Sequence, residues 1–138
     1  MEILKRFGVS MEESLLEKFD RFIKENNYQN RSEAIRDLIR KELVEQEWLG
    51  KSQAVAGAII MVYDHHKRDL MDILVDIQHH HQKLIISSQH IHLDHKMCLE
   101  VIIVKGQIDE VHKLESELRS VKGVKHASLA KSTLGKGI

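Results

Sequence analysis

The sequence has no proline, one cysteine and few aromatic residues, and each of these limits what the chain can be. A single cysteine cannot form an intrachain disulfide, which is typical of proteins that work in a reducing cytoplasm. Aromatic residues make up 4% of the 138 residues, so a core must be built mainly from aliphatic side chains. No apolar run approaches the roughly 20 residues that a membrane-spanning helix requires, and no signal-peptide pattern begins the sequence. We therefore expect a cytoplasmic protein with no membrane part.

Charge is balanced, with 21 basic and 21 acidic residues, so composition alone gives no sign of a nucleic-acid binder. Histidine is unusually frequent and unevenly placed. All ten histidines, together with the cysteine, follow residue 50. This asymmetry predicts two domains with different roles, residues 1–50 and residues 51–138, of which only the second carries nitrogen and sulfur ligands.

A half-buried strand is predicted at residues 6–10, where apolar residues alternate with polar or small ones. A helix should follow at once, because Ser10 and Glu13 fit a capping box. Its apolar residues recur at helical spacing to about Glu25.

A second helix is predicted from Asn30, which forms another capping box with Glu33, to about Gly50. One strand and two amphipathic helices cannot bury their apolar faces alone, and a lone strand leaves its backbone unpaired. A two-fold dimer with paired strands would solve both problems. The order of elements, with NRSEAIRDLIR at residues 30–40, resembles the ribbon-helix-helix DNA-binding family.

This resemblance implies that the paired strands enter the major groove and read base edges with their outward side chains. The corresponding residues are Arg6, Gly8 and Ser10. Arg6 suits a bidentate contact to guanine, whereas Gly8 has no side chain with which to read a base. The free amides near Arg31 and Ser32, at the start of the second helix, are suited to hold a phosphate.

The second domain alternates strand-like and helix-like segments in the order β-α-β-β-α-β. This is the ferredoxin-like split unit, often an ACT-type sensing domain in small regulators. The sequence therefore predicts an α+β protein, a ribbon-helix-helix domain followed by an ACT-like domain. The expected strands are residues 54–63, 83–93, 98–104 and 124–129, and the expected helices run over residues 65–79, with Asp64 as cap, and from residue 106 to about residue 123.

A metal site is suggested by His90, His92 and Cys98. Two residues that are two apart on a strand leave the same face, and the cysteine lies just across the predicted hairpin. Three ligands do not complete a four-coordinate site. His79, which opens the run His79–His81, is the best candidate for the fourth, and a symmetry mate could supply it. The alternative is that the cysteine is a small buried hydrophobe and the histidines are surface residues.

The motif combination resembles the nickel-responsive regulator family NikR. It consists of the ribbon-helix-helix signature followed by QHHH at residues 78–81, HIH at 90–92 and CLE at 98–100. The resemblance implies one square-planar Ni(II) per subunit, held by His90, His92 and Cys98 of one subunit and His79 of another. It also implies a homotetramer built as a dimer of dimers, which binds a palindromic operator and represses nickel uptake.

Three further pairs of residues gain expected roles. They are Lys67 with Arg68, Glu33 with Asp37, and Gln78 with Glu100. By the resemblance, the first pair contacts the DNA backbone and the second forms a further cation site. The third pair is placed to orient the imidazole ligands by hydrogen bonding.

Other functions remain open at this level. A hydrolase would need an open metal position and a general base, which this sequence does not offer, so we expect no enzyme and no small organic substrate. A metal-storage protein would leave the first domain unexplained. Two regulators remain as alternatives: an ACT-type DNA-binding protein that responds to an amino acid, and a sensor of another metal such as copper, which also accepts planar sites.

Overall fold

A computed structural model of the chain describes residues 2–50 and 53–138. The chain forms two compact units, the first ending at Lys41 and the second beginning at Glu42. The fold class is α+β, as predicted. In the described residues, no helix is both long enough and apolar enough to cross a membrane.

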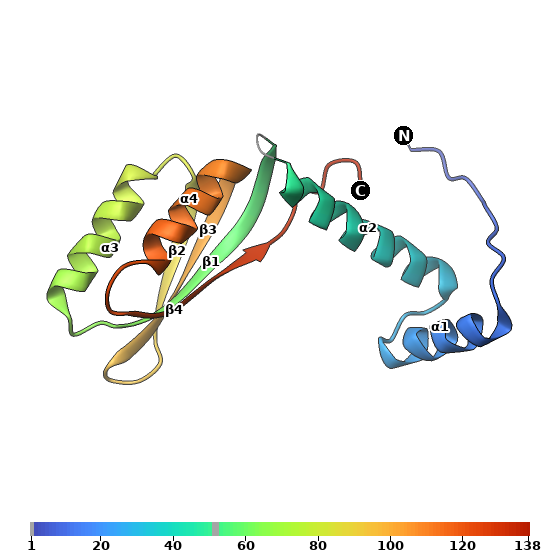
Figure 1. The fold of residues 1–138 in the computed structure, drawn as a ribbon, viewed down its shortest axis with the longest axis horizontal. Coiled ribbons are helices and arrows are strands. Elements are labelled where there is room, and N and C mark those ends of the chain that lie inside the picture. Colours follow the sequence, from blue (N-terminus) through green and yellow to red (C-terminus); the bar gives the residue numbers. More distant parts are fainter. Residues whose placement is uncertain (1, 51–52) are drawn as a thin grey trace. The chain divides into compact units, whose positions relative to one another are not determined.

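The first unit contains an extended segment and two helices, α1 (Glu13–Glu25) and most of α2 (Arg31–Leu49). The segment before α1 runs without helical or strand pairing (Figure 1). The strand predicted at residues 6–10 therefore does not form within the single chain. The physical reason is that a strand needs a hydrogen-bonded neighbour, and no described part of the same chain pairs with this segment.

The predicted helix caps differ in outcome. Ser10 does not cap α1, because the residue at the cap position is Glu12 and no side chain bonds there. At α2 the prediction is half confirmed: Asn30 Oδ1 accepts a hydrogen bond from the Glu33 amide at 2.9 Å. The Glu33 carboxylate pairs with Arg36 instead of returning to the cap.

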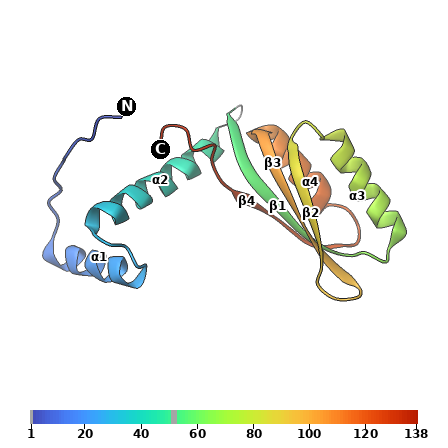
Figure 2. The same cartoon turned by 180° about the vertical axis from the view of Figure 1, so that it is seen from behind.

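The second unit is a four-stranded antiparallel sheet with two helices on one face (Figures 1 and 2). The strand order is β2-β3-β1-β4, which is the predicted ferredoxin-like arrangement. Its elements are β1 (Ala54–Asp64), α3 (Arg68–His80), β2 (Ile85–His92), β3 (Met97–Gln107), α4 (Ile108–Arg119) and β4 (Val124–Lys131).

Helix α3 begins later than predicted. Asp64 still belongs to β1, and its carboxylate accepts a hydrogen bond from the His66 amide at 2.9 Å, which forms a local turn. Lys67 occupies the cap position of α3. Asp64 was therefore wrong as a helix cap, because its side chain serves the turn that leaves the strand.

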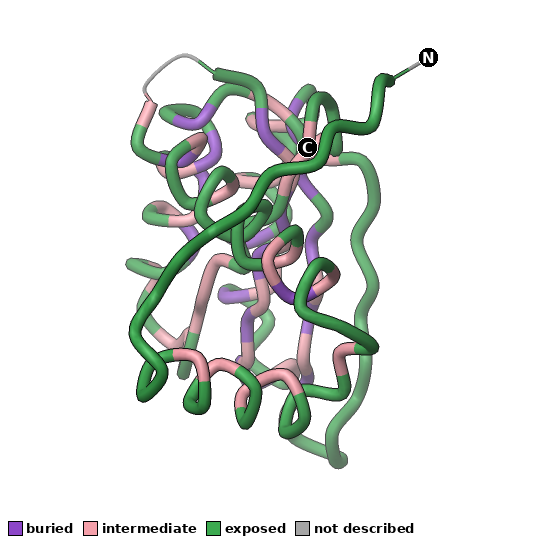
Figure 3. Tube along the Cα trace, turned by 90° about the vertical axis from the view of Figure 1, so that its right-hand side faces the viewer, coloured by how far each residue is buried: buried purple, intermediate pink, exposed green. Residues whose placement is uncertain are grey.

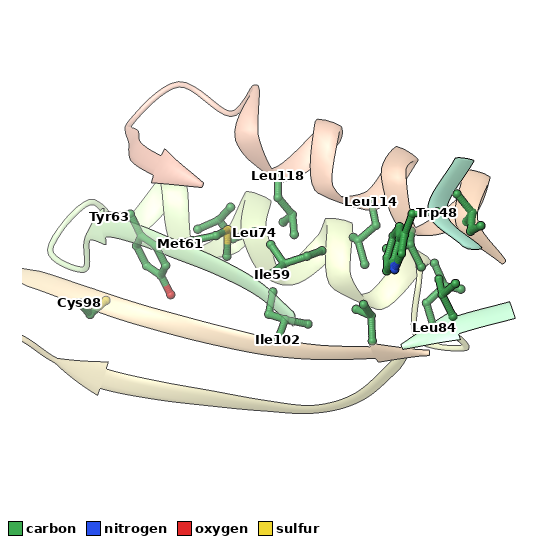
Figure 4. Close-up of a cluster of buried hydrophobic side chains, with 14 of the residues drawn as sticks. Trp48, Ile59, Met61, Tyr63, Leu74, Leu84, Cys98, Ile102, Leu114 and Leu118 are labelled. Carbon is green, nitrogen blue, oxygen red and sulfur yellow. The ribbon is translucent and has the colours of Figure 1, made fainter. Parts of the chain in front are cut away.

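The hydrophobic core lies between the sheet and the helices of the second unit (Figure 4). Figure 3 colours the buried parts of the backbone trace in purple. Alternate residues of β1 and β3 are buried, as period-two side-chain orientation requires. Figure 4 shows Tyr63 and Cys98 at one end of this core and Trp48 and Leu84 at the other.

Trp48 explains why the end of α2 belongs to the second unit. Its ring is 4% exposed and is part of the second unit's core, and Val44 packs against the same core. The contacts within each unit therefore place the division inside α2, between Lys41 and Glu42. The domain boundary expected at residue 50 stays a prediction.

Candidate metal centre and nucleic-acid interface

The hairpin of β2 and β3 brings part of the predicted ligand set together. In its register, His92 lies opposite Cys98 and His90 lies opposite Glu100. His90 Nε2 is 2.8 Å from Cys98 Sγ. An imidazole nitrogen and a thiol sulfur thus already converge, and both are donors suited to a borderline metal ion such as nickel, copper or zinc.

The other nitrogen of His90 faces two polar side chains. The Tyr63 hydroxyl lies 3.4 Å from His90 Nδ1, and Glu100 Oε1 lies 3.8 Å from the same atom. Gln78 donates a hydrogen bond to Glu100 Oε2 at 3.0 Å. Gln78 therefore holds the Glu100 carboxylate on the Nδ1 side of the His90 ring, whereas Nε2 is directed at the sulfur.

Burial changes the acidity of the two side chains next to His90. It raises the pKa of the Cys98 thiol, and the nearby Tyr63 hydroxyl opposes the rise while Glu100 adds to it. Burial also raises the pKa of Tyr63 far above its usual range, with Glu100 and Cys98 as further causes. The thiol is therefore protonated at neutral pH, and a metal that binds as a thiolate complex must release that proton.

His92 has a different neighbour. Its ring stacks on His65, with centroids 4.5 Å apart and planes inclined by 15°. His65 Nδ1 is buried and has no hydrogen-bond partner among the residues that the structure describes. The His92 ring is thus held beside His65, although its backbone faces Cys98.

His79 lies in the last turn of α3 and is exposed. Within residues 2–50 and 53–138 of one chain, no three His, Cys, Asp or Glu side chains converge as a metal site would require. The structure therefore brings together His90 and Cys98, but it does not bring His79 to them.

Asp94 shapes the turn that joins β2 to β3. Its carboxylate accepts hydrogen bonds from the backbone amides of Lys96 and Met97, both at 2.7 Å. These bonds hold the pKa of Asp94 below its usual range. The turn fixes the register that places His92 opposite Cys98.

The first unit presents the predicted DNA-reading residues at its surface. Arg6, Gly8 and Ser10 are exposed in the extended segment. Beside them lies a groove of about 820 Å³ within this unit. Its apolar lining consists of Leu4, Phe7, Val9, Met11, Leu16, Phe19, Ile35 and Ile39. Since α1 has no buried residue, this unit has an incomplete apolar core in the single chain.

The start of α2 carries the predicted phosphate site. The first intrahelical bond runs from the Ala34 amide to the Asn30 carbonyl, so the amides of Arg31 and Ser32 precede it and have no helical acceptor. Arg31 is not free, however. Its guanidinium forms a two-bond ion pair with Asp20 of α1.

The two carboxylates of the predicted second cation site also have partners. The Glu33 side chain pairs with Arg36, and Asp37 accepts a hydrogen bond from the Tyr28 hydroxyl and pairs with Lys41 at 3.0 Å. On the second unit, Lys67 and Arg68 are both exposed at the start of α3.

Three residues that contact the predicted site residues could not be predicted to do so from the sequence. Tyr63 reaches His90 because β1 pairs with β3 and sets Tyr63 opposite Cys98, a long-range register that no local pattern shows. The stacking of His65 on His92 depends on the turn after β1. Asp20 was missed because it sits on the polar side of α1, where a carboxylate is ordinary. The spacing of eleven residues to Arg31 gives no local signal.

Comparison with known proteins agrees with both units. Residues 56–132 match the NikR C-terminal nickel-binding domain, and residues 5–46 match the ribbon-helix-helix proteins of the copG family. A solved structure of an uncharacterized protein from Thermotoga maritima shares the fold over 57% of this chain and 98% of its own, with a TM-score of 0.53 at 12% identity.

Two relatives, each named "putative nickel-responsive regulator", extend the likeness to nearly the whole chain. The protein of Syntrophus aciditrophicus (strain SB) is 55% identical over 135 residues, which cover 98% of each chain. That of Chlorobium limicola is 54% identical over 135 residues, covering 98% of this chain and all of its own. The family consists of DNA-binding regulators and not of enzymes. This chain belongs to the NikR family of nickel-responsive regulators.

Proposed function

We propose that this chain is a cytoplasmic repressor of nickel uptake, which binds a palindromic operator when Ni(II) occupies a site shared by two subunits. The observation that carries this proposal is the approach of His90 Nε2 to Cys98 Sγ at 2.8 Å inside a nickel-binding domain. The balanced charge of the chain fits a few placed phosphate contacts better than a broad basic surface.

The proposed ligands are His90, His92 and Cys98 of one subunit and His79 of the partner subunit, with one Ni(II) per chain. Two features support the shared site. No complete ligand group exists among the described residues of one chain, and His79 is exposed and therefore accessible to a second copy. Bound nickel would supply bonds that tie two subunits together. His92 joins this set only when its ring leaves the stack on His65.

The residues around His90 select how that imidazole binds. Tyr63 and Glu100 both face Nδ1, so they keep the ring in the orientation that presents Nε2 to the metal. Ni(II) and Cu(II) favour planar four-coordination, whereas zinc favours a tetrahedron. A planar arrangement of these four ligands, and not their donor types, would therefore select nickel or copper over zinc.

DNA binding is proposed for a two-fold dimer of the first unit. The extended segments of two chains pair as a ribbon, and apolar side chains of the partner fill the groove beside Phe7 and Val9. Arg6 and Ser10 then read base edges, while Gly8 permits close approach of the backbone. Lys67 and Arg68 add phosphate contacts from the start of α3, which also carries His79.

A homotetramer built as a dimer of dimers is proposed from the second unit. The sheet face opposite the helices carries Ile60, Val62, Leu99, Val101 and Ile103, none of which is fully buried. Burial of this face between copies would stabilise an assembly. A further cation site at Glu33 and Asp37 requires both carboxylates to exchange their present partners for the cation.

The test combines metal binding and DNA binding. Ni(II) is titrated into the metal-free chain while its electronic absorption is followed, with Cys98→Ala as the matched variant. We expect a sulfur-to-nickel charge-transfer band that saturates near one Ni(II) per chain and is lost in the variant. Fluorescence anisotropy with DNA from upstream of the gene that encodes the chain should show binding only when nickel is present. DNA binding that is indifferent to nickel, or a band that persists in the variant, would contradict the proposal.

A further inference from the structure

The ion pair between Asp20 and Arg31 has a geometry that leaves part of the guanidinium free. Arg31 Nε lies 2.9 Å from Asp20 Oδ1, and Arg31 Nη2 lies 2.9 Å from Asp20 Oδ2. This side-on contact uses two of the five N–H donors of arginine. The three remaining donors, including both on Nη1, lie on the edges of the guanidinium that do not face Asp20.

The pair joins two helices at the place where an anion is expected. Asp20 belongs to α1, and Arg31 is the first residue of α2. The amides of Arg31 itself and of Ser32 have no helical acceptor. The other ion pairs described in this unit, Arg36 with Glu33 and Lys41 with Asp37, each lie within one helix.

Fold stability is a weak explanation for this pair. The two side chains are 57% and 46% exposed, and exposed ion pairs contribute little to folding free energy. The hydrogen bonds from Arg31 lower the pKa of Asp20, so the carboxylate is charged at any pH used for DNA binding. What the pair does achieve is a fixed direction for a long, flexible side chain.

We propose that Asp20 is a positioning residue for DNA: it holds Arg31 so that the free edge of the guanidinium and the amides of α2 bind the same phosphate. This inference rests on the proposed function, because it needs the first unit to bind DNA. A rival role predicts the opposite effect. If Asp20 merely neutralised Arg31 and repelled phosphate, its removal would strengthen DNA binding.

The test measures the affinity of the nickel-loaded full chain for a fluorescein-labelled duplex of random sequence, because phosphate contacts dominate such binding. The variants are Asp20→Ala, Arg31→Ala and the double substitution. Glu115→Ala is the charge-matched control, since it also removes one carboxylate from an ion pair with arginine, but in the second unit. Anisotropy is recorded between about 50 and 200 mM salt.

We expect Asp20→Ala and Arg31→Ala each to weaken binding and to reduce the slope of log affinity against log salt by about 0.9 for each phosphate that the variant no longer binds. The double variant should bind no more weakly than Arg31→Ala, because Asp20 acts only through Arg31. Glu115→Ala should match the wild type or bind slightly more tightly.

Three results would overturn the inference. Equal or tighter binding by Asp20→Ala, relative to the control, would show that Asp20 does not position Arg31, while nickel-dependent binding by the wild type stands. Still weaker binding when Asp20→Ala is added to Arg31→Ala would show general damage to the unit. If the nickel-loaded wild type binds neither this duplex nor DNA from upstream of the gene that encodes the chain, the proposed function fails and the inference fails with it.

Discussion

Replacement of Trp48 by alanine should destabilise the second unit strongly. The indole is 4% exposed, its N–H donates to the Ser132 carbonyl at 2.8 Å, and its ring meets His112 edge-on with centroids 5.7 Å apart. A buried aromatic side chain removes about 150–250 Å² from water, and Trp to Ala substitutions in cores cost about 3–5 kcal/mol. We expect a loss of stability in this range, because Trp48 is part of the central cluster.

The assay is urea unfolding of the metal-free chain, followed by far-UV circular dichroism. All variants are compared at one protein concentration, because self-association would make stability depend on concentration. With a urea m-value of about 2 kcal/mol/M, the midpoint of Trp48→Ala should fall by about 1.5–2.5 M.

Leu49→Ala is the matched control, because the neighbouring Leu49 is 83% exposed and should change stability by less than about 0.5 kcal/mol. A destabilisation below about 1 kcal/mol for Trp48→Ala, with unchanged m-value, would refute the packing of the end of α2 into the second unit.

Three further predictions concern the strands, the turn and the thiol. Gly57→Ala should lower the free energy of unfolding by about 1–3 kcal/mol, because a Cβ there would lie 2.8 Å from a backbone carbonyl of β4. Gly8→Ala is the control, because the space around Gly8 is open. Equal Tm values for the two variants in thermal unfolding would contradict the strand register. Asp94→Ala should lower Tm at neutral pH. The folded state holds the pKa of Asp94 below its ordinary value of 3.8, so the charged carboxylate stabilises the fold above that pH. This stabilisation should disappear as pH falls through the lower pKa of the folded state. A difference in Tm between wild type and variant that does not depend on pH would refute this. Nickel affinity should rise by about tenfold per pH unit for each proton released, because burial raises the pKa of Cys98 and the thiol is protonated below that pKa. A nickel affinity that does not change between about pH 6 and 8 would contradict thiolate ligation.

Local patterns predicted the elements of the second unit well, because each strand and helix carries its own apolar periodicity. The order of strands and helices and the antiparallel hairpin that sets His92 opposite Cys98 were confirmed. Helix starts were predicted less well. Ser10 and Asp64 have the right chemistry for caps, yet α1 and α3 begin after Glu12 and Lys67. The Asp64 carboxylate instead accepts a hydrogen bond in the turn that leaves β1.

The strand at residues 6–10 does not form in the single chain, because no described part of that chain pairs with it and a strand needs a hydrogen-bonded neighbour. The contacts of the candidate site also fall into those that are local in sequence and those that depend on distant parts of the chain. The approach of His90 to Cys98 follows from a hairpin that is local in sequence. Tyr63 depends on a pairing between distant strands, and the stack of His92 on His65 depends on a turn whose shape no motif encodes.

A mixed assembly of two variants tests whether one nickel ion is held by two subunits. His79→Ala and Cys98→Ala chains are each purified and shown to lack the sulfur-to-nickel absorption band. They are then unfolded together, refolded as a mixture and titrated with Ni(II). If His79 comes from the partner subunit, random equal mixing should restore the band at about one quarter of the sites. If all four ligands belong to one chain, the mixture should show no more absorption than its parts, and the shared site would be refuted.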